Sequence, residues 1–296
     1  LPFEHRLFID PDGLIDFYLN FSQSWSPYWC DKRLERLENF LKSINKVNIF
    51  DKFVQRILKI LNCETKYITP KKYCSWELSK HFPNFEIHNK DLINDLIDFT
   101  YRGVWPGVSS YSYKPHIRHA AHRSKRELRA ILEKYFSNII NDYLLANKAN
   151  FFIDDNTFNI FFALSLLEIL PKSKIIHIYR DPRDVVASFS KQRWCPNDKI
   201  KAAKFYKSMM DYWIFKIKPE LSNDSFYELS FENLINHPKD SVHSLCNFLN
   251  LSFDINMLNI DLSHSHIGRW KSDFSNHEAK KIIDILNPII NELNYY

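Results

Sequence analysis

KIIHIYRDPRDVVASF, residues 174–189, contains in succession the signals for a strand, a tight turn and a helix. The apolar run from Ile175 to Tyr179 predicts a buried strand. Pro182 fixes its own φ and keeps the preceding residue out of the helical region, so the chain must turn there. Asp184 is then expected to cap the helix that follows.

A junction of this kind is suited to an anion, because free N–H groups and the helix dipole attract negative charge at a helix start. Arg180 and Arg183 add guanidinium groups, which bind phosphate oxygens through paired hydrogen bonds. Ser188 lies further along the same helix, where its hydroxyl can face the same anion as Arg180. An arginine-rich surface loop with structural salt bridges would contain the same residues, so the pattern alone leaves both interpretations open.

R-D-P-R-D-V-V-A-S, residues 180–188, resembles the 3′-phosphate-binding signature of the sulfotransferases that use 3′-phosphoadenosine 5′-phosphosulfate (PAPS). In that family the first arginine and the final serine of the motif hold the 3′-phosphate. The resemblance therefore implies Arg180 and Ser188 as cofactor-binding residues, with Arg183 beside them. It also implies an α/β fold of the P-loop type, with three layers, a central parallel sheet and a large helical insertion.

The activity implied by this resemblance is transfer of a sulfuryl group from PAPS to a hydroxyl or amine of a small-molecule or glycan acceptor, without a metal. Two alternatives remain open. One is a non-catalytic relative that binds 3′-phosphoadenosine nucleotides. The other is a P-loop kinase acting on a small molecule, which would need a Walker-type loop and magnesium.

Composition is compatible with a single domain of this kind. The chain has 296 residues, 45% of them hydrophobic, and a formal net charge of +5. A mildly basic chain suits a polyanionic donor and gives no specific support for nucleic-acid binding. No apolar run approaches the length of a membrane span, and no histidine or cysteine spacing suggests a metal site.

The five cysteines include no closely spaced pair, so a disulfide framework is not indicated. A reducing compartment is then the default, and we expect a cytoplasmic protein. The four glycines are scattered along the chain, which excludes a glycine-rich phosphate loop within it.

LPFEHRLF, residues 1–8, resembles a P-E-x-x-F-like segment of bacterial and tyrosylprotein sulfotransferases. In the tyrosylprotein enzymes a glutamate here is the catalytic base. The resemblance implies Glu4 as the base and Arg6 as a contact to sulfate or acceptor. An ordinary surface turn is the alternative.

The 5′-phosphosulfate loop of the family, P-R/K-S-G-T-T/S, is not found in the sequence. We expect it either to lie upstream of Leu1 or to have been lost, and the lack of an initial methionine favours the first. A protein without that loop would lack the electrostatic stabilisation of the transferring group, and we would expect no catalysis from it.

The chain is predicted to form one sulfotransferase-like domain, with a helical acceptor region at residues 14–149 and a cofactor-binding core at residues 150–296. Apolar residues at three-to-four spacing predict helices in the first region. These are Leu14–Phe21, Lys32–Ile44, Asp51–Leu61 and Leu92–Phe99. Tyr101–Pro115 is rich in turn residues and is predicted to be an irregular loop with a role in acceptor binding.

The segment from Lys114 to Arg123 is the most basic in the chain. It is either a solvated basic face or a set of contacts to an anionic acceptor or to the cofactor phosphates. Ser124 and Glu127 directly after it predict a capping box and the start of a helix.

Residues 151–157, FFIDDNT, predict a short strand, Phe151–Ile153, followed by a turn. In many sulfotransferases the corresponding turn lies near the sulfate and the acceptor. The resemblance implies Asn156 and Thr157 as substrate contacts, whereas capping of the next helix is the alternative.

FENLINHP, residues 231–238, resembles the family's Y-E-D-L-x-x-x-P, whose tyrosine contacts the adenine. Phe231 would stack on the base without donating a hydrogen bond. The preceding residues Phe226–Leu229 predict a strand, and Pro238 predicts the start of a helix.

G-R-W-K, residues 268–271, resembles the family's C-terminal G-x-W-K/R cofactor loop, although the R-K-G triplet found upstream in the cytosolic enzymes is absent. The resemblance implies Gly268, Arg269, Trp270 and Lys271 as cofactor contacts. Ser275 and Glu278 predict a capping box for the last helix, which Pro288 is expected to interrupt.

Overall fold

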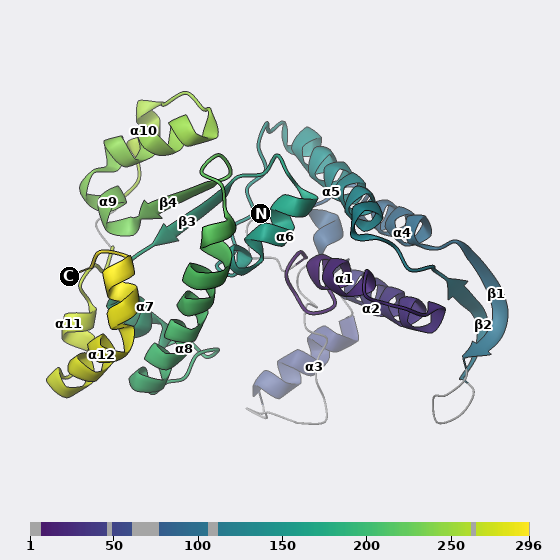
Figure 1. The fold of residues 1–296 in the computed structure, drawn as a ribbon, viewed down its shortest axis with the longest axis horizontal. Coiled ribbons are helices and arrows are strands. Elements are labelled where there is room, and N and C mark those ends of the chain that lie inside the picture. Colours follow the sequence, from purple (N-terminus) through teal and green to yellow (C-terminus); the bar gives the residue numbers. More distant parts are fainter. Residues whose placement is uncertain (1–6, 46–48, 61–76, 106–111, 262–264, 296) are drawn as a thin grey trace. The chain divides into compact units, whose positions relative to one another are not determined.

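The computed structural model describes residues 7–45, 49–105 except 61–76, 112–261 and 265–295. The chain divides into two compact units, Leu1–Leu170 and Pro171–Tyr296, here called the N-terminal and C-terminal units. Figure 1 shows the helices and strands of both. The division falls at Leu170, later than the start predicted for the cofactor-binding core.

The described part of the N-terminal unit is mainly helical, and its hydrophobic core is formed by α1, α2, α4 and α5 (Figure 1). Its elements are α1 (Leu14–Phe21), α2 (Pro27–Asn45), α3 (Ile49–Ile60), α4 (Phe85–Leu96), β1 (Phe99–Trp105), β2 (Ser112–His119), α5 (Lys125–Asn147) and α6 (Ala163–Ile169), with short 3-10 turns at Leu78–Lys80 and Asn159–Phe162. The helices predicted at Leu14–Phe21 and Lys32–Ile44 are present as α1 and α2, and each buries an apolar stripe in this core. The helix predicted at Asp51–Leu61 is present as α3, but large apolar side chains such as Ile49, Phe50 and Phe53 are exposed. Of the helix predicted at Leu92–Phe99, only the part up to Leu96 is helical, as the end of α4, and Phe99 begins β1.

Two predictions for this unit were wrong. Tyr101–Pro115 was predicted to be irregular, but β1 and β2 form an antiparallel hairpin there. Aromatic and β-branched residues favour a pleated strand, and the stacked rings of Phe99 and His119, with centroids 4.4 Å apart, contribute a cross-strand contact. Phe151–Ile153 is not a strand, since the structure gives it no ladder partner and only Phe152 of the three packs inward.

Charged partners within the same unit surround the end of the basic segment. Arg118 donates from Nε to Asp31 at 3.1 Å and from Nη1 to Glu38 at 2.7 Å. Arg123 pairs with Asp98 at 2.7 Å. These arginines therefore serve internal ion pairs. The capping box that opens α5 is confirmed.

The C-terminal unit is built on a parallel pair of strands, β3 (Ile175–Tyr179) and β4 (Phe226–Ser230), as the sequence predicted. Its helices are α7 (Pro182–Phe189), α8 (Lys199–Tyr212), α9 (Phe231–Asn236), α10 (Pro238–Leu249), α11 (Trp270–Asp273) and α12 (Asn276–Glu292). A π-helical turn, Trp213–Ile217, and 3-10 turns at Lys218–Glu220 and Ile255–Leu258 complete it. The chain is thus a mixed α/β protein with a small parallel sheet.

Helical segments cover both faces of this sheet. The ring of Trp213, directly after α8, lies 4.9 Å from His177 and 5.5 Å from Phe226, which belong to the same face. Tyr227 faces the other way and stacks on Phe248 of α10, with centroids 5.2 Å apart. Figure 1 shows β3 and β4 side by side, with α10 and α8 on opposite sides of them. The carboxyl ends of the two strands therefore lie together, at the edge where the polar turn begins.

Helix α12 runs through Pro288, so the predicted interruption was wrong. A proline inside a helix costs about 3 kcal/mol or more. Three apolar side chains around it, Leu286, Ile289 and Ile290, are buried. Each contributes roughly 1.5–3 kcal/mol on burial, which outweighs that cost. Pro288 lies on the exposed side of the helix.

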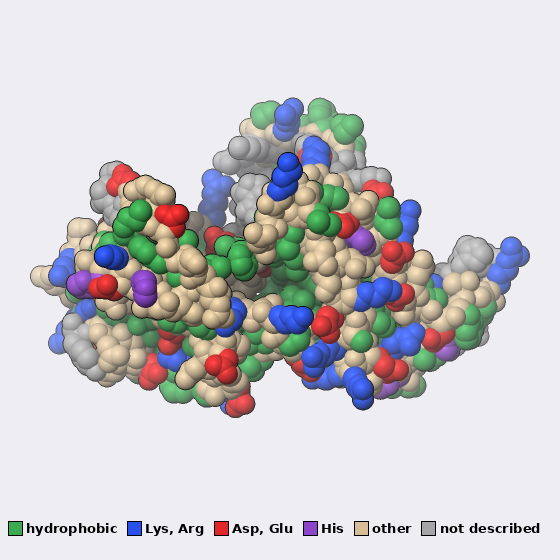
Figure 2. Space-filling view, turned by 90° about the horizontal axis from the view of Figure 1, so that it is seen from above, with side chains coloured by type: hydrophobic (Ala, Val, Ile, Leu, Met, Phe, Trp, Pro, Cys, Tyr) green, Lys and Arg blue, Asp and Glu red, His purple; other side chains and the backbone are tan. Residues whose placement is uncertain are grey.

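No helix in the described ranges is long and apolar enough to cross a membrane. On the face shown in Figure 2, lysine and arginine side chains are interspersed with acidic ones in both units. This mixing agrees with the small net charge of the chain, +5.

The capping box of α5 should stabilise the N-terminal unit measurably. The Ser124 hydroxyl accepts from the N–H of Glu127 at 3.3 Å, and the Glu127 carboxylate accepts from the N–H of Ser124 at 2.8 Å. We expect Ser124→Ala to lower the free energy of unfolding by about 1 kcal/mol, measured by urea denaturation. Ser137→Ala, at an exposed position inside the same helix, is the matched control and should be neutral or slightly stabilising. Equal stability of the two variants would contradict this account.

Glu228 should make stability depend on pH. Burial raises the pKa of its carboxyl, but hydrogen bonds from His177 at 3.1 Å and Lys218 at 2.7 Å outweigh that and hold the pKa below its ordinary value. A lowered folded-state pKa stabilises the fold above the unfolded pKa, and the stabilisation is lost as the pH falls through the folded value. Glu228→Gln should therefore reduce the urea midpoint more at pH 7 than near pH 4, whereas the exposed Glu220→Gln should change little at either pH. A difference between Glu228→Gln and wild type that does not vary with pH would argue against the pairing.

Candidate functional site

The turn that joins β3 to α7 begins with Asp181, not Asp184, as the helix cap. The Asp181 carboxylate accepts from the N–H of Arg183 at 2.8 Å, and Pro182 occupies the first turn of the helix. The prediction that Asp184 caps this helix was wrong, because a proline that already has helical φ moves the helix start toward β3. Arg180 is left between the strand and the helix.

Arg180 is held by two neighbours and keeps part of its guanidinium unused. Its Nη2 donates to the carbonyl of His266 at 3.2 Å and lies 3.3 Å from Oδ2 of Asp184. Its Cζ lies 5.5 Å from the ring centroid of Phe231, within cation–π range. The Nε of Arg180 is buried and has no hydrogen-bond partner among the described residues. A buried donor of this kind is costly to leave unpaired, so an acceptor oxygen from a ligand or from water would stabilise it.

Asp184 is completely buried on α7 and connects this helix to the loop of residues 266–270, here called the glycine loop. Its Oδ2 accepts from the N–H of Gly268 at 2.7 Å, and its Oδ1 accepts from the N–H of Trp270 at 2.9 Å. Gly268 has a φ of +76°, which a residue without Cβ adopts readily. The sequence did not indicate this role, because the partners of Asp184 lie 84 and 86 residues away.

Arg183 is occupied within the turn itself. Its Nε and Nη2 donate to both carboxylate oxygens of Asp181, the shortest contact being 2.7 Å, and its Cζ lies 4.5 Å above the ring of Trp270. The guanidinium thus fastens Trp270 to the start of α7. This is the salt-bridged arrangement that the sequence left open as an alternative to direct anion binding.

Ser188 lies one turn beyond Asp184 on α7, and residues four apart share one face of a helix. It is half-buried, and its hydroxyl has no hydrogen-bond partner within the described part of the chain. The face of α7 that carries Asp184 toward Arg180 and the glycine loop therefore also carries a free hydroxyl.

The cations of the G-R-W-K segment differ in their surroundings. Arg269 donates from Nε to Asp273 at 3.0 Å, and the same carboxylate accepts from Lys191 at 2.7 Å. Lys271 is exposed, with its Nζ 6.0 Å from the ring centroid of Trp270. Lys271 is therefore the more available of the two charges.

Glu232, at the start of α9, supports the turn from the β4 side. Its carboxylate accepts from the N–H of Asp181 at 3.0 Å and from the hydroxyls of Ser230 and Tyr295. Burial, together with the hydrogen bond to Glu232, raises the pKa of Tyr295, so this phenol stays protonated as a donor. Sequence reasoning missed both residues, although the acidic residue after Phe231 in FENLINHP is the signal that could have identified Glu232.

Four residues predicted for the site, Glu4, Arg6, Asn156 and Thr157, do not belong to the C-terminal unit. Glu4 and Arg6 lie outside the described residues. Asn156 and Thr157 belong to the N-terminal unit, where Oδ1 of Asn156 accepts from the N–H of Phe158 at 3.0 Å in a local turn. The remaining predicted residues, Arg180, Arg183, Ser188, Phe231, Gly268, Arg269, Trp270 and Lys271, all belong to the C-terminal unit.

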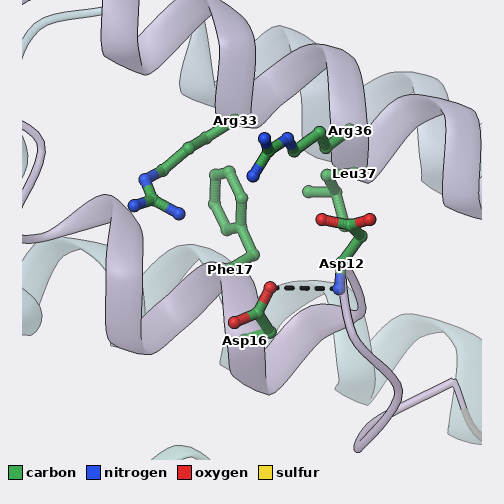
Figure 3. Close-up of a pocket in the computed structure, with 6 residues that line it drawn as sticks. All are labelled: Asp12, Asp16, Phe17, Arg33, Arg36 and Leu37. Carbon is green, nitrogen blue, oxygen red and sulfur yellow. Dashed lines mark hydrogen bonds between the residues drawn. The ribbon is translucent and has the colours of Figure 1, made fainter.

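The N-terminal unit contains cavities of its own. Figure 3 shows a small one between α1 and α2, with arginines reaching from α2 and aspartates on the α1 side; its volume of about 10 Å³ suits a single water. Its lining residues are Asp12, Asp16, Phe17, Arg33, Arg36 and Leu37. A larger cavity of about 560 Å³ lies between α2 and α4. Neither is lined by a residue predicted for the site.

The arrangement in the C-terminal unit is a candidate anion site whose arginines are held by neighbouring side chains. Arg180 offers a buried N–H donor and a positive charge, Ser188 offers a hydroxyl, and the glycine loop lies beside them with Lys271. Two carboxylates, Asp181 and Asp184, position the arginines. The aromatic rings of Phe231 and Trp270 stack on the same two guanidinium groups. Such a set recognises a phosphate attached to a planar, stackable group.

Comparison with known proteins gives a family for the chain. Residues 54–255, more than half of the sequence, match the model of a sulfotransferase family. Arg180, Ser188 and Phe231 lie inside the matched range, and the glycine loop follows it. A search of curated proteins gave no match. Among solved structures, a sulfotransferase domain from the curacin biosynthetic pathway is 16% identical, with 57% of this chain and 69% of that chain covered and a TM-score of 0.37.

Proposed function

We propose that this chain, which belongs to the sulfotransferase family, transfers a sulfuryl group from PAPS to a hydroxyl or amine of a small-molecule or glycan acceptor. The single observation that carries the choice of donor is the buried, unpartnered Nε of Arg180 at the carboxyl end of β3. A ribose 3′-phosphate supplies the acceptor oxygens that this donor lacks.

The residues around Arg180 fit a 3′-phosphoadenosine group. Ser188 provides a second donor on the same face of α7 as Asp184, and Phe231 provides an aromatic ring directly beside the guanidinium. Gly268 has no side chain, and a Cβ at this position would meet no atom within 4 Å, so the backbone of the glycine loop borders open space there. The fit supports PAPS over a donor that lacks a 3′-phosphate.

When bound, PAPS supplies the sulfuryl group. The residues of this chain bind and orient the donor and the acceptor, and one of them takes the proton from the acceptor. Arg180 and Ser188 hold the 3′-phosphate, Phe231 packs beside the adenine, and Lys271 lies near the negative charge of the donor. Glu4 acts as the general base that takes the proton from the acceptor, and Arg6 contacts the sulfate or the acceptor. Asn156 and Thr157 contact the substrate as well.

The finer assignments belong to the same proposal. The small parallel sheet is part of a three-layer fold of the P-loop type, and the chain belongs to the bacterial and tyrosylprotein-like branch. The sulfotransferase acts in the cytoplasm and needs no metal. The alternative of a non-catalytic nucleotide-binding relative keeps the same Arg180 site and differs only in the absence of turnover.

Loss of Arg180 should weaken binding of adenosine 3′,5′-bisphosphate, the product of the donor. Removing hydrogen bonds to a charged group costs about 1.5–3 kcal/mol, so Arg180→Ala should raise the dissociation constant roughly 10- to 150-fold in isothermal titration. Ser188→Ala, which removes a neutral donor, should raise it about tenfold or less. Arg193→Ala removes one exposed positive charge of the same unit and is the matched control. Unchanged binding by Arg180→Ala would contradict the site.

Turnover separates the enzyme from a non-catalytic relative. With PAPS and a panel of phenols, sugars and amines, we expect release of adenosine 3′,5′-bisphosphate that depends on the acceptor. Glu4→Gln should lower kcat about 100-fold or more with little change in bisphosphate affinity, because a general base acts in the transition state. Tight bisphosphate binding without turnover on any acceptor would favour the non-catalytic alternative.

A further inference from the structure

We propose that Asp184 is a positioning residue for recognition of the 3′-phosphate: it sets the direction of the Arg180 guanidinium and fastens the glycine loop beside it. The inference rests on the proposed function, since it concerns the site that would hold the donor. Asp184 itself is fully buried and is not expected to touch the nucleotide.

The contacts form a closed ring. Oδ2 of Asp184 lies 3.3 Å from Nη2 of Arg180 and accepts from the N–H of Gly268 at 2.7 Å. The same Nη2 donates to the carbonyl of His266, two residues before that glycine, at 3.2 Å. One carboxylate oxygen of Asp184 therefore contacts both the Arg180 guanidinium and the glycine loop, and the guanidinium contacts the loop directly. A displacement of the guanidinium or of the loop would strain its contact with Asp184 and the hydrogen bond between Arg180 and His266.

The other carboxylate oxygen of Asp184 anchors this set of contacts to the end of the glycine loop. Oδ1 accepts from the N–H of Trp270 at 2.9 Å, and the Trp270 ring stacks on Arg183. Both oxygens are thus used, which fixes the plane of the carboxylate. Because Nη2 of Arg180 is engaged, its Nε remains as the buried donor without a partner. Asp184 in this way decides which edge of the guanidinium is presented to an anion.

Electrostatics alone would oppose this arrangement. A buried carboxylate next to Arg180 reduces the positive potential that a phosphate dianion experiences and repels the dianion directly. If Asp184 acted only through its charge, its removal would strengthen phosphate binding. If it acts by positioning, its removal weakens binding although the repulsion is gone. The two roles predict changes of opposite sign.

Asp184→Asn is the decisive variant. An amide has one acceptor oxygen and one NH₂ donor, so in either orientation the donor faces a backbone N–H of Gly268 or Trp270. We expect the dissociation constant of adenosine 3′,5′-bisphosphate to rise about tenfold or more, as for loss of a hydrogen bond to a charged group. Binding of adenosine 5′-phosphate, which lacks the 3′-phosphate, should change less than about twofold, because it does not use Arg180.

The matched control is Asp198→Asn. Asp198 caps α8 by accepting from the N–H of Lys201 at 2.7 Å, so the control removes the same charge from another carboxylate that accepts a backbone N–H in the same unit. Asparagine caps helices as well as aspartate does, and both affinities should stay at wild-type values. The double variant Asp184→Asn with Arg180→Ala should bind the bisphosphate no more weakly than Arg180→Ala alone, since Asp184 acts through Arg180.

Each result decides the proposal. Tighter bisphosphate binding by Asp184→Asn, equal losses for the two nucleotides, or additive losses in the double variant would overturn the positioning role while leaving the proposed donor intact. A wild-type protein that does not bind the bisphosphate would overturn the donor and the positioning role together.

If Asp184→Asn does not fold, Gly268→Ala provides the second variant. The added Cβ would meet nothing within 4 Å, but the φ of +76° at this position would strain the loop. It should then show the same selective loss, and a loss shared by both nucleotides would overturn the proposal.

Discussion

One buried carboxylate joins three segments of the C-terminal unit that are far apart in the sequence. Asp184 belongs to α7, pairs with the arginine that follows β3, and accepts two backbone N–H groups of the glycine loop. Burying a carboxylate is costly unless it is paired and fully hydrogen-bonded, and here both oxygens are used. The candidate anion site depends on this contact, because Asp184 is the side chain that contacts Arg180 and the glycine loop at the same time.

The parallel strand pair provides the frame for that contact. The register between β3 and β4 places Tyr179 opposite Ser230, so both strands end at the same edge of the sheet. One continues into the turn of Asp181 and Pro182, and the other into α9 with Glu232. The hydrogen bond from the N–H of Asp181 to Glu232 links the two exits at 3.0 Å. Ligands of open α/β sheets commonly bind at the carboxyl ends of parallel strands, and the candidate site of this unit lies at that edge.

Local signals in the sequence were sufficient for much of the fold. The strand before Arg180, the helix start at Pro238 and the two capping boxes depend on neighbouring residues, and all are present. The predictions were wrong where contacts between residues far apart in the sequence determine the secondary structure. The hairpin of β1 and β2 needs a partner strand, and the continuity of α12 through Pro288 depends on buried neighbours of that helix. The role of Asp184 was hidden for the same reason, since its partners lie in another part of the chain. Membership of the sulfotransferase family agrees with the resemblance of the turn sequence.

The most direct measurement is a crystal structure of the protein with adenosine 3′,5′-bisphosphate. The account predicts the 3′-phosphate within hydrogen-bonding distance of Nε of Arg180 and of the Ser188 hydroxyl, while Asp184 still accepts from Gly268 and Trp270. A 3′-phosphate bound elsewhere, or an Arg180 side chain that turns away from Asp184 when the nucleotide binds, would contradict it.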